Sequence, residues 1–532
     1  MTNTQIDTTS LLTILGVIAA VWALISPTNK LQLRFCMTWW DWGVGGIVLF
    51  LIHYLVFAPA LQSVGLYYSL GSWKWGLDGG SAVYLLLLAS ALYFFWRTRF
   101  PALVRGRVGI FLELIENLNL TSRYDELVLL VEPQLSRLIT LSKHRPMVVR
   151  LIDRIDKPQN NLAALLRGEV PKARSAWANR LSSVLQSLKS WSLAHAKDST
   201  LSHEVLLSLV ASPKLTKHLA IAHPYFCLKL LETEEAVHSD FIENYMDALL
   251  DVPASRLYVE LKNNQNLNGG SRLYLPDNNR LLRFFFFDAS AAMKNGMDKA
   301  IGEPVRRRLD EDKVLAAKLN EPIGSYYEVG KFRCPINSGI SLFEIMVHEG
   351  IHQGLQDHMW LYYFGEFSKK ILKQMPIPTD EESHQEWPTP FHYLLYRMIG
   401  VATDWMKQCS RIVDEDIPAD TLNAEGFDRH FISKEAAKML GMMLEDIIPS
   451  EKLSTSFKIY LLEVVVRCHI ELQNDPKLKD VASSFLGATI SGSDYPTSVP
   501  YRRELKDVFR KMDHVLKRNA ATFAQALEAL IV

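Results

Sequence analysis

The stretch SAVYLLLLASALYFFW, residues Ser81–Trp96, contains no charged residue and is followed at once by Arg97 and Arg99. Its length is close to the ~20 residues that an α-helix needs to cross the hydrocarbon core of a bilayer. Two further apolar runs precede it, at Leu11–Ser26 and Gly43–Leu61. Three such runs in the first hundred residues predict three transmembrane helices, and this prediction decides the fold class.

Charge is distributed unevenly along the 532 residues. Lys and Arg together number 58, as do Asp and Glu, but the first 103 residues contain only 8 charged side chains. The rest has the charged fraction of an ordinary globular protein. This pattern excludes a wholly cytosolic globule, a disordered chain and a strongly basic nucleic-acid-binding protein, so no nucleic acid is expected as a partner. Five scattered cysteines without a CxxC pair predict free thiols.

The residues that flank the apolar runs predict how the chain is oriented. Tryptophans precede the second and third runs, as is typical of the bilayer interface. Lys30 and Arg34 lie in the first loop, and four arginines follow Trp96. Because cations beside spans stay in the cytoplasm, we expect a multi-pass protein of the inner (plasma) membrane. Its N-terminus would lie outside and its C-terminal region in the cytoplasm. The lipid bilayer is an expected partner, and the sequence is also compatible with a homo-oligomer.

The remaining sequence shows mainly helical periodicity. After the anchor at 1–103, residues 104–250 are expected to form a helical cytoplasmic domain, 251–375 an α+β segment, and 376–532 a C-terminal helical region. The last two are alternatively one domain. Strands are expected at Arg256–Leu261 and Ser271–Leu275, which alternate, and in the apolar run Leu281–Phe287. The expected fold class is mostly α: three N-terminal transmembrane helices, then a helical cytoplasmic region with a minor β element.

One motif carries chemistry. The sequence His348-Glu349-Gly350-Ile351-His352 matches HExxH and lies in a predicted helix from about Ser338 to Leu372. Residues four apart lie on the same face of a helix, so both imidazoles can reach one Zn²⁺. Glu349 stands beside them and could take a proton from a metal-bound water.

This motif resembles the site of the zincin-type zinc metallopeptidases. The resemblance covers about ten residues, and no family is recognised over the whole chain. It implies that His348 and His352 hold zinc, as the cofactor, and that Glu349 is the catalytic base. Gly354 departs from the pattern of that group, which has a hydrophobic residue at this position.

The third metal ligand is left with several candidates. His358 has the spacing of the third histidine in the metzincin subgroup, HExxHxxGxxH, but Gly354 comes one position before the glycine of that pattern. If the helix continues, His358 lies about 9 Å beyond His352 along the axis and cannot share its metal. His392 and Asp404, in a predicted helix at Phe391–Gln408, are the alternatives.

Two functions follow from these observations. The first is a membrane-anchored cytoplasmic zinc-dependent metallopeptidase, in which water activated by Glu349 attacks a peptide bond of an unknown protein or peptide substrate. The second is a non-catalytic, membrane-anchored helical sensor, scaffold or effector that binds a protein partner through its cytoplasmic part. In the second case the histidines are side chains of a buried core helix.

Overall fold

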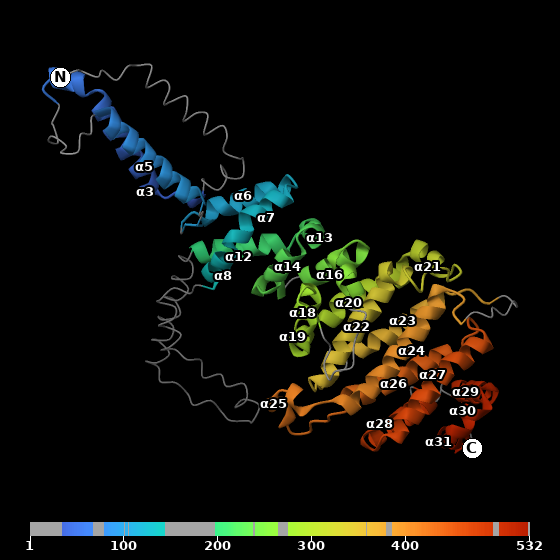
Figure 1. Ribbon diagram of the computed structural model, residues 1–532. Helices are drawn as coiled ribbons and strands as arrows, with labels where there is room; N and C mark the ends of the chain where they lie inside the picture. The colour runs from blue at the N-terminus through green and yellow to red at the C-terminus, as the bar shows by residue number, and fades with distance from the viewer. Residues whose placement is uncertain are drawn as a thin grey trace, which may run out of the picture. The chain divides into compact units, whose positions relative to one another are not determined.

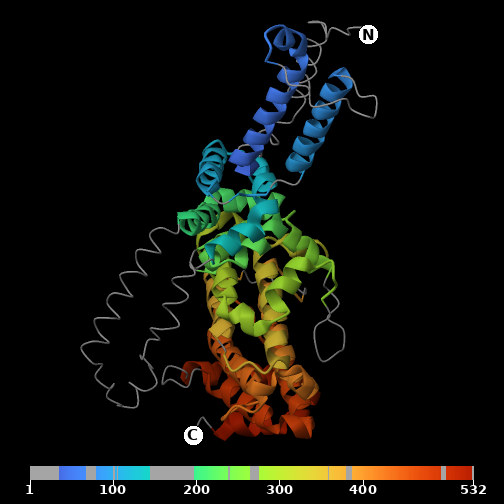
Figure 2. The ribbon, with the colours of Figure 1, turned by 90° about the vertical axis from the view of Figure 1, so that its left-hand side faces the viewer.

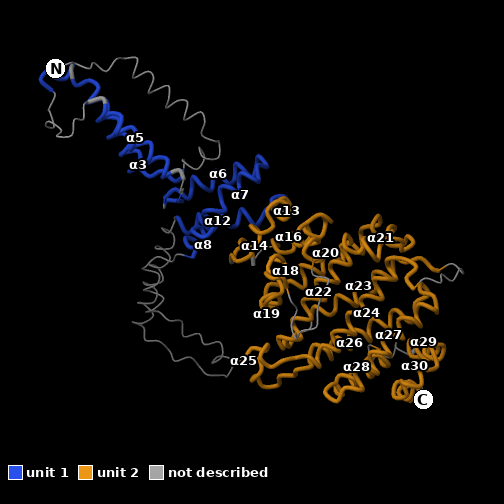
Figure 3. Tube along the Cα trace, in the orientation of Figure 1, with its two compact units in different colours: residues 1–215 blue, residues 216–532 orange. Residues whose placement is uncertain are grey.

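The computed structural model describes residues 35–66, 79–99, 102–104, 106–143, 197–237, 240–263, 275–357, 359–378, 386–492 and 499–529. All regular structure in these residues is helical, and neither view of the ribbon contains a strand arrow in them (Figures 1 and 2). The mostly α fold is therefore confirmed. The chain divides into two compact units, residues 1–215 and 216–532 (Figure 3).

The first unit holds an apolar helical hairpin and a small group of amphipathic helices. Its helices are α3 (Trp39–Val56), α4 (Ala58–Ser63), α5 (Gly79–Arg99), α6 (Val108–Leu120), α7 (Tyr124–Val131), the 3₁₀ turn η1 (Glu132–Gln134), α8 (Leu135–Ser142) and α12 (Lys197–Val210). Helix α12 packs against α6 and α8.

Helices α3 and α5 pack against each other and are joined by a polar cluster at one end. Thr38 and Asp41 form a capping box at the start of α3. Tyr93 Oη donates to Asp41, and Arg97 Nε lies 3.4 Å from the same carboxylate. Because residue 41 begins α3 and residues 93–97 end α5, the two helices run antiparallel. Their outer surface is apolar, with Phe50 69% exposed.

The prediction of three spans is met only in part. Among the described helices, α3 alone is long and apolar enough to cross a membrane by itself. The stretches Asp198–Val210 and Pro213–Ala222 pass the same test only if they are taken together as one span bent by 73°. The apolar stretch Ser81–Arg97 of α5 is shorter, and Leu11–Ser26 lies outside the described residues. The number of spans therefore stays a prediction.

The second unit is a larger assembly of helices, and α13 (Pro213–Ala222) contains the boundary at which it begins. The helices up to the motif are α14 (Pro224–Leu231), α15 (Glu234–Val237), α16 (Phe241–Asp251), α17 (Arg256–Asn263), α18 (Arg280–Phe286), α19 (Ala289–Lys294), α20 (Met297–Glu311), α21 (Lys313–Leu319), η2 (Gly330–Arg333) and α22 (Pro335–His352). Those that follow are η3 (Met359–Leu361), α23 (Tyr362–Gln374), α24 (Pro390–Gln408), η4 (Cys409–Arg411), η5 (Asp414–Asp416), α25 (Ala419–Leu422), α26 (Phe431–Ile447), α27 (Thr455–Asn474), η6 (Pro476–Leu478), α28 (Lys479–Ser491), α29 (Val499–Lys511), α30 (His514–Asn519) and α31 (Ala521–Ala529).

The prediction of a minor β element is wrong at both places where the structure tests it. The stretch expected as a first strand is α17, and the apolar run after residue 280 is α18. The buried carboxylate of Glu260 on α17 accepts hydrogen bonds from the backbone N–H of Leu281 and Leu282, at 2.9 and 3.1 Å. It thereby satisfies the free donors at the start of α18, as a capping side chain does. Ser271–Tyr274 lies outside the described residues.

Helix α22 is the central helix of the second unit and packs against α20 and α24 (Figure 1). It begins with Pro335 in its first turn, where a missing N–H costs nothing. It ends at His352, so the expected helix to Leu372 is interrupted. Gly354 has φ +68° and donates to Ile351 O, while Leu355 N donates to Gly350 O. These two bonds are the Schellman motif that closes helices at a left-handed glycine.

Candidate functional site

The HExxH motif occupies the last turn and a half of α22 and is buried. The ring centroids of His348 and His352 lie 4.7 Å apart, with 44° between the ring planes. The exposed fractions are 7% for His348, 1% for Glu349 and 0% for His352. The helix therefore brings the two imidazoles together, as the spacing predicts, and it does so inside the protein.

Three of the four ring nitrogens of this pair have no partner within hydrogen-bond distance, although the Gln408 side chain lies near enough to influence both rings. His348 Nδ1 and both nitrogens of His352 are buried and make no hydrogen bond among the described residues. A buried polar atom without a partner costs about 1–3 kcal/mol, and most such atoms in proteins are paired. Three of them in two adjacent imidazoles form an exception that a metal ion at this position would explain. The donor set suits zinc, which favours neutral imidazole.

The electrostatics of the site keep both rings neutral at pH 7. Burial lowers the pKa of His348 to about 4, although the carboxylate of Asp404 opposes this shift. Burial and the neighbouring His348 lower the pKa of His352 to about 4, against the attraction of Glu349 and Asp416. Only a neutral imidazole has a lone pair available for a metal, so the protein holds these side chains in the form that can ligate.

Glu349 is held at the side of the pair. Its Oε2 accepts a hydrogen bond of 3.0 Å from Gln353 Nε2, and its Oε1 lies 3.9 Å from His348 Nδ1. Gln353 is itself fixed by Phe287 O and by the backbone N–H of Ala289. The carboxylate is thus positioned beside the two rings by a glutamine that the motif does not include.

The candidates for a third ligand lie in different places. His358 is outside the described residues. His392 packs edge-on against Phe457, and its Nδ1 lies 2.8 Å from Thr389 Oγ1. It is also twelve residues from Asp404 on α24, about 18 Å along the helix. Asp404 lies close enough for its charge to act on His348. No third side chain in the described ranges joins both motif histidines in a group whose ligand atoms all lie within 4.8 Å of one another.

The segment 412–430 covers the C-terminal end of α22. A Cβ built on Gly354 would lie 3.0 Å from Ile417 and 3.2 Å from Phe427. Gln356 exchanges two hydrogen bonds with the backbone of Asp428, at 3.1 and 3.2 Å. On the other side Trp360 folds back onto Gly350, where a Cβ would meet the indole at 2.8 Å. These contacts cover the turn that ends α22 and the side of the motif at Gly350.

Sequence reasoning missed the two glutamines of this site. Gln408 lies one turn after Asp404, and its Nε2 donates to that carboxylate at 3.1 Å. Its side chain also raises the pKa of both motif histidines, against the larger effect of burial. The spacing of four residues from Asp404 on the same helix is the signal that could have identified it.

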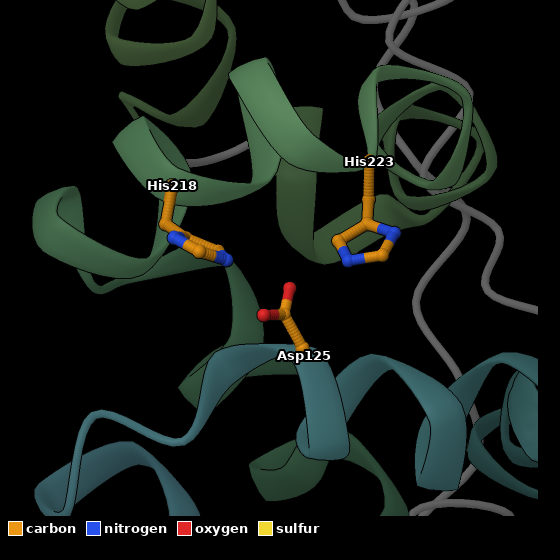
Figure 4. A group of neighbouring side chains, drawn as sticks. All are labelled: Asp125, His218 and His223. Atoms are coloured by element: carbon orange, nitrogen blue, oxygen red, sulfur yellow. The ribbon is translucent and has the colours of Figure 1, made fainter.

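A second pair of histidines lies in the same unit. His218 on α13 and His223, which precedes α14, have ring centroids 6.4 Å apart (Figure 4). Their spacing of five residues places them on either side of a helix break, so the sequence gives no motif for them. Asp125, also labelled there, belongs to the first unit, and the histidine pair by itself supplies only two ligands.

Comparison with known proteins gives no match: no family model, no curated protein and no solved structure is similar to the chain. The function is therefore argued from the residues described above.

Proposed function

We propose that the chain is a membrane-anchored zinc-dependent metallopeptidase whose metal is held by His348 and His352. The observation that carries this proposal is the set of three buried, unpaired nitrogens on two neutral imidazoles one turn apart. Asp404 is the proposed third ligand, because its charge acts on His348; its carboxylate does not form a 4.8 Å group with both imidazoles in this structure, so it would have to approach them when the metal binds. A zinc ion bound there would acidify a coordinated water. Glu349, beside the pair, would take the proton and pass it to the leaving amine.

Access to this site requires a movement of the segment that covers it. Glu349 and His352 are almost fully buried, so a peptide bond cannot reach them until surrounding chain moves, and the segment 412–430 is the part that we propose to move. The exchange of two hydrogen bonds between Gln356 and Asp428 is the polar part of this cover. We therefore propose an enzyme that is latent until the segment is displaced, in the way that active-site lids control access.

The proposed location is the inner membrane, with three spans. Helices α3 and α5 run antiparallel and expose apolar side chains, which suits a pair of helices that cross a bilayer in opposite directions. Trp39 and Trp40 at the start of α3, and Trp96 near the end of α5, fall at the same end of the hairpin. An aromatic belt at one interface would produce this arrangement. With Arg97 and Arg99 at that end, the end is assigned to the cytoplasm.

The burial of Glu349 also favours the second function, a non-catalytic sensor or scaffold. In that case the histidines would hold a metal for structural reasons, and no peptide would reach it. A structural zinc site has four protein ligands, whereas a catalytic one leaves a position open for water. The two functions therefore differ in whether Glu349 is needed once the metal is bound.

The test is peptide hydrolysis by the purified full chain in detergent, with and without Zn²⁺. The substrate is a mixed library of fluorogenic peptides, and the cover is loosened by Gln356→Ala. We expect Glu349→Gln to keep the metal and lose at least 100-fold in rate, as removal of a general base does. Glu344→Gln, five residues earlier on α22, is the matched control and should keep the activity. If the protein binds metal but shows no hydrolysis that depends on Glu349, the peptidase function is excluded and the non-catalytic scaffold function is retained.

A further inference from the structure

A cavity of about 220 Å³ lies in the second unit beside α22, and its lining on that helix extends from Asn337 to Ile345, short of the HExxH motif. Residues of α17, η2, α22 and α24 line it, among them Tyr258, Lys331, Asn337, Ser341, Tyr393 and Arg397. An engineered cavity of about 150 Å³ holds a benzene molecule. This cavity is therefore large enough for a six-membered ring with one acidic group attached.

Lys331 is the cation of this cavity that has no carboxylate beside it. Its Nζ lies 4.2 Å from the ring centroid of Tyr327, 5.1 Å from that of Phe332 and 5.9 Å from that of Tyr393. Within the described ranges no Asp or Glu forms an ion pair with it. The ammonium group thus rests among aromatic faces, with hydrogen-bond donors available to a ligand.

Arg397 adds a second positive charge, which is already oriented. Its guanidinium donates to Ser341 Oγ at 2.7 Å, to Glu344 Oε2 at 2.9 Å and to the backbone and side chain of Asn337. Asn337 in turn donates to Lys331 O at 2.8 Å. Burial and the nearby Arg397 together lower the pKa of Lys331, which is the response of an ammonium that lacks a counter-ion.

The start of α22 contributes a third source of positive potential. Asn337 and Ser338, in or next to its first turn, line the cavity. The N-terminus of a helix carries a partial positive charge, which favours anions, although the N–H groups of its first turn here are taken up by Cys334. One carboxylate, Glu344, faces two full cations and this helix end. The cavity therefore has an uncompensated positive charge.

We propose that this cavity binds a small aromatic acid, with its carboxylate or phosphate oxygens on Lys331 and its ring against Tyr258, Phe332 and Tyr393. The ammonium supplies the charge-assisted hydrogen bonds, Arg397 supplies potential, and the aromatic walls cover the ring. No residue of the HExxH motif lines the cavity, whose lining on α22 extends from Asn337 to Ile345. The site is thus separate from the proposed metal site and does not depend on it.

Calorimetry on the full chain in detergent tests this proposal, with phenyl phosphate, benzoate and inorganic phosphate as anionic probes and benzamide as the neutral probe. We expect phenyl phosphate or benzoate to bind at least tenfold more tightly than benzamide and inorganic phosphate. The better of the two acids identifies which head group the cavity prefers. Lys331→Met should weaken that binding at least tenfold, while Lys331→Arg, which keeps the charge, should restore most of it.

Two controls make the outcome decisive. Lys313→Met removes an exposed lysine from α21 and should leave the affinity unchanged. The double variant His348→Ala/His352→Ala should also bind the acid normally, so failure of the metal site would not affect this result. Benzamide binding as tightly as the better of the two aromatic acids, no binding of any acid at millimolar concentration, or unchanged affinity in Lys331→Met would each overturn the proposal.

Discussion

Helices α3 and α22 have the same length, 18 residues, and are both rich in apolar side chains, yet the protein uses them in opposite ways. On α3 only Asp41 and Ile52 are buried. On α22 every residue from Ile336 to His352 is buried except Ser341 and Glu344. The first presents its apolar surface outward, and the second is enclosed by other helices.

The polar residues explain the difference between the two helices. On α3 the buried acid lies at the very end, where it caps the helix and binds the last turns of α5. On α22 polar residues occur near the start, in the middle and at the C-terminal end, and most of them are buried in protein. Polar groups are costly in a bilayer core but can be paired within a protein interior. Buried polar residues along its length therefore mark an apolar helix as one that other helices surround.

The largest effect that separates the two helices is expected from removing a phenylalanine. Phe343 on α22 is fully buried against Tyr363, Phe364 and Phe367, so Phe343→Ala should reduce the free energy of unfolding by about 3–5 kcal/mol. Phe50→Ala on α3 should cost less than about 0.5 kcal/mol in detergent. Urea unfolding of the full chain, followed by fluorescence, measures both. Equal losses of unfolding free energy in the two variants would show that α3 and α22 do not differ in packing.

Glycines provide a second contrast, in which the two changes have opposite signs. A Cβ on Gly339 of α22 would lie 2.5 Å from Val305 Cγ2, so Gly339→Ala should destabilise by about 1–3 kcal/mol through overpacking. Gly46 of α3 has nothing within 4 Å, and Gly46→Ala should raise helix stability by up to about 1 kcal/mol. Thermal unfolding midpoints of the two variants should move in opposite directions. A gain in Gly339→Ala would show that α22 is not closely packed.

Acid should weaken the second unit through its buried histidines. Burial lowers the pKa of His392 to about 4 from an ordinary value of 6.5, so the unfolded chain binds a proton first as the pH falls. Stability is therefore lost between pH 6.5 and pH 4, and roughly 1–3 kcal/mol of that loss is assigned to this residue. His392→Gln should make the decline of unfolding free energy with pH shallower. An unchanged slope would contradict the assignment.

The smallest effect is expected at the cap of α3. Thr38 accepts from Asp41 N, while the Asp41 carboxylate accepts from Thr38 N, so Thr38→Ala removes half of a capping box. The expected cost is about 1 kcal/mol, confined to the first turn of the helix. Hydrogen exchange of the amides at 39–42 should accelerate about fivefold, while exchange in α22 stays the same. Faster exchange throughout the hairpin would show that the cap stabilises more than the helix end.

Periodicity predicted the helical class correctly, and it placed His348 and His352 on one helix. It failed at α17 and α18 because a short apolar or alternating run has no length to distinguish strand from helix. Glu260 stabilises the helical form of that region by accepting a hydrogen bond from Leu281 at the start of α18, twenty-one positions further along the chain. The sequence also could not show Gln353 or the Lys331 cavity, since both depend on which helices surround α22. Gly354 was the residue of the sequence that could have predicted the end of α22, because its backbone there has the left-handed conformation that glycine adopts readily.

Metal analysis of the purified full chain tests the central claim most directly. Zinc is measured by mass spectrometry after dialysis, in the wild type, in His348→Ala/His352→Ala and in the control His392→Gln. The account predicts about one zinc per chain in the wild type and in the control, and none in the double variant. Asp404→Ala and His358→Ala, added to the series, identify the third ligand by which of them loses the metal. A correctly folded wild type that retains no zinc even after loading would contradict the account.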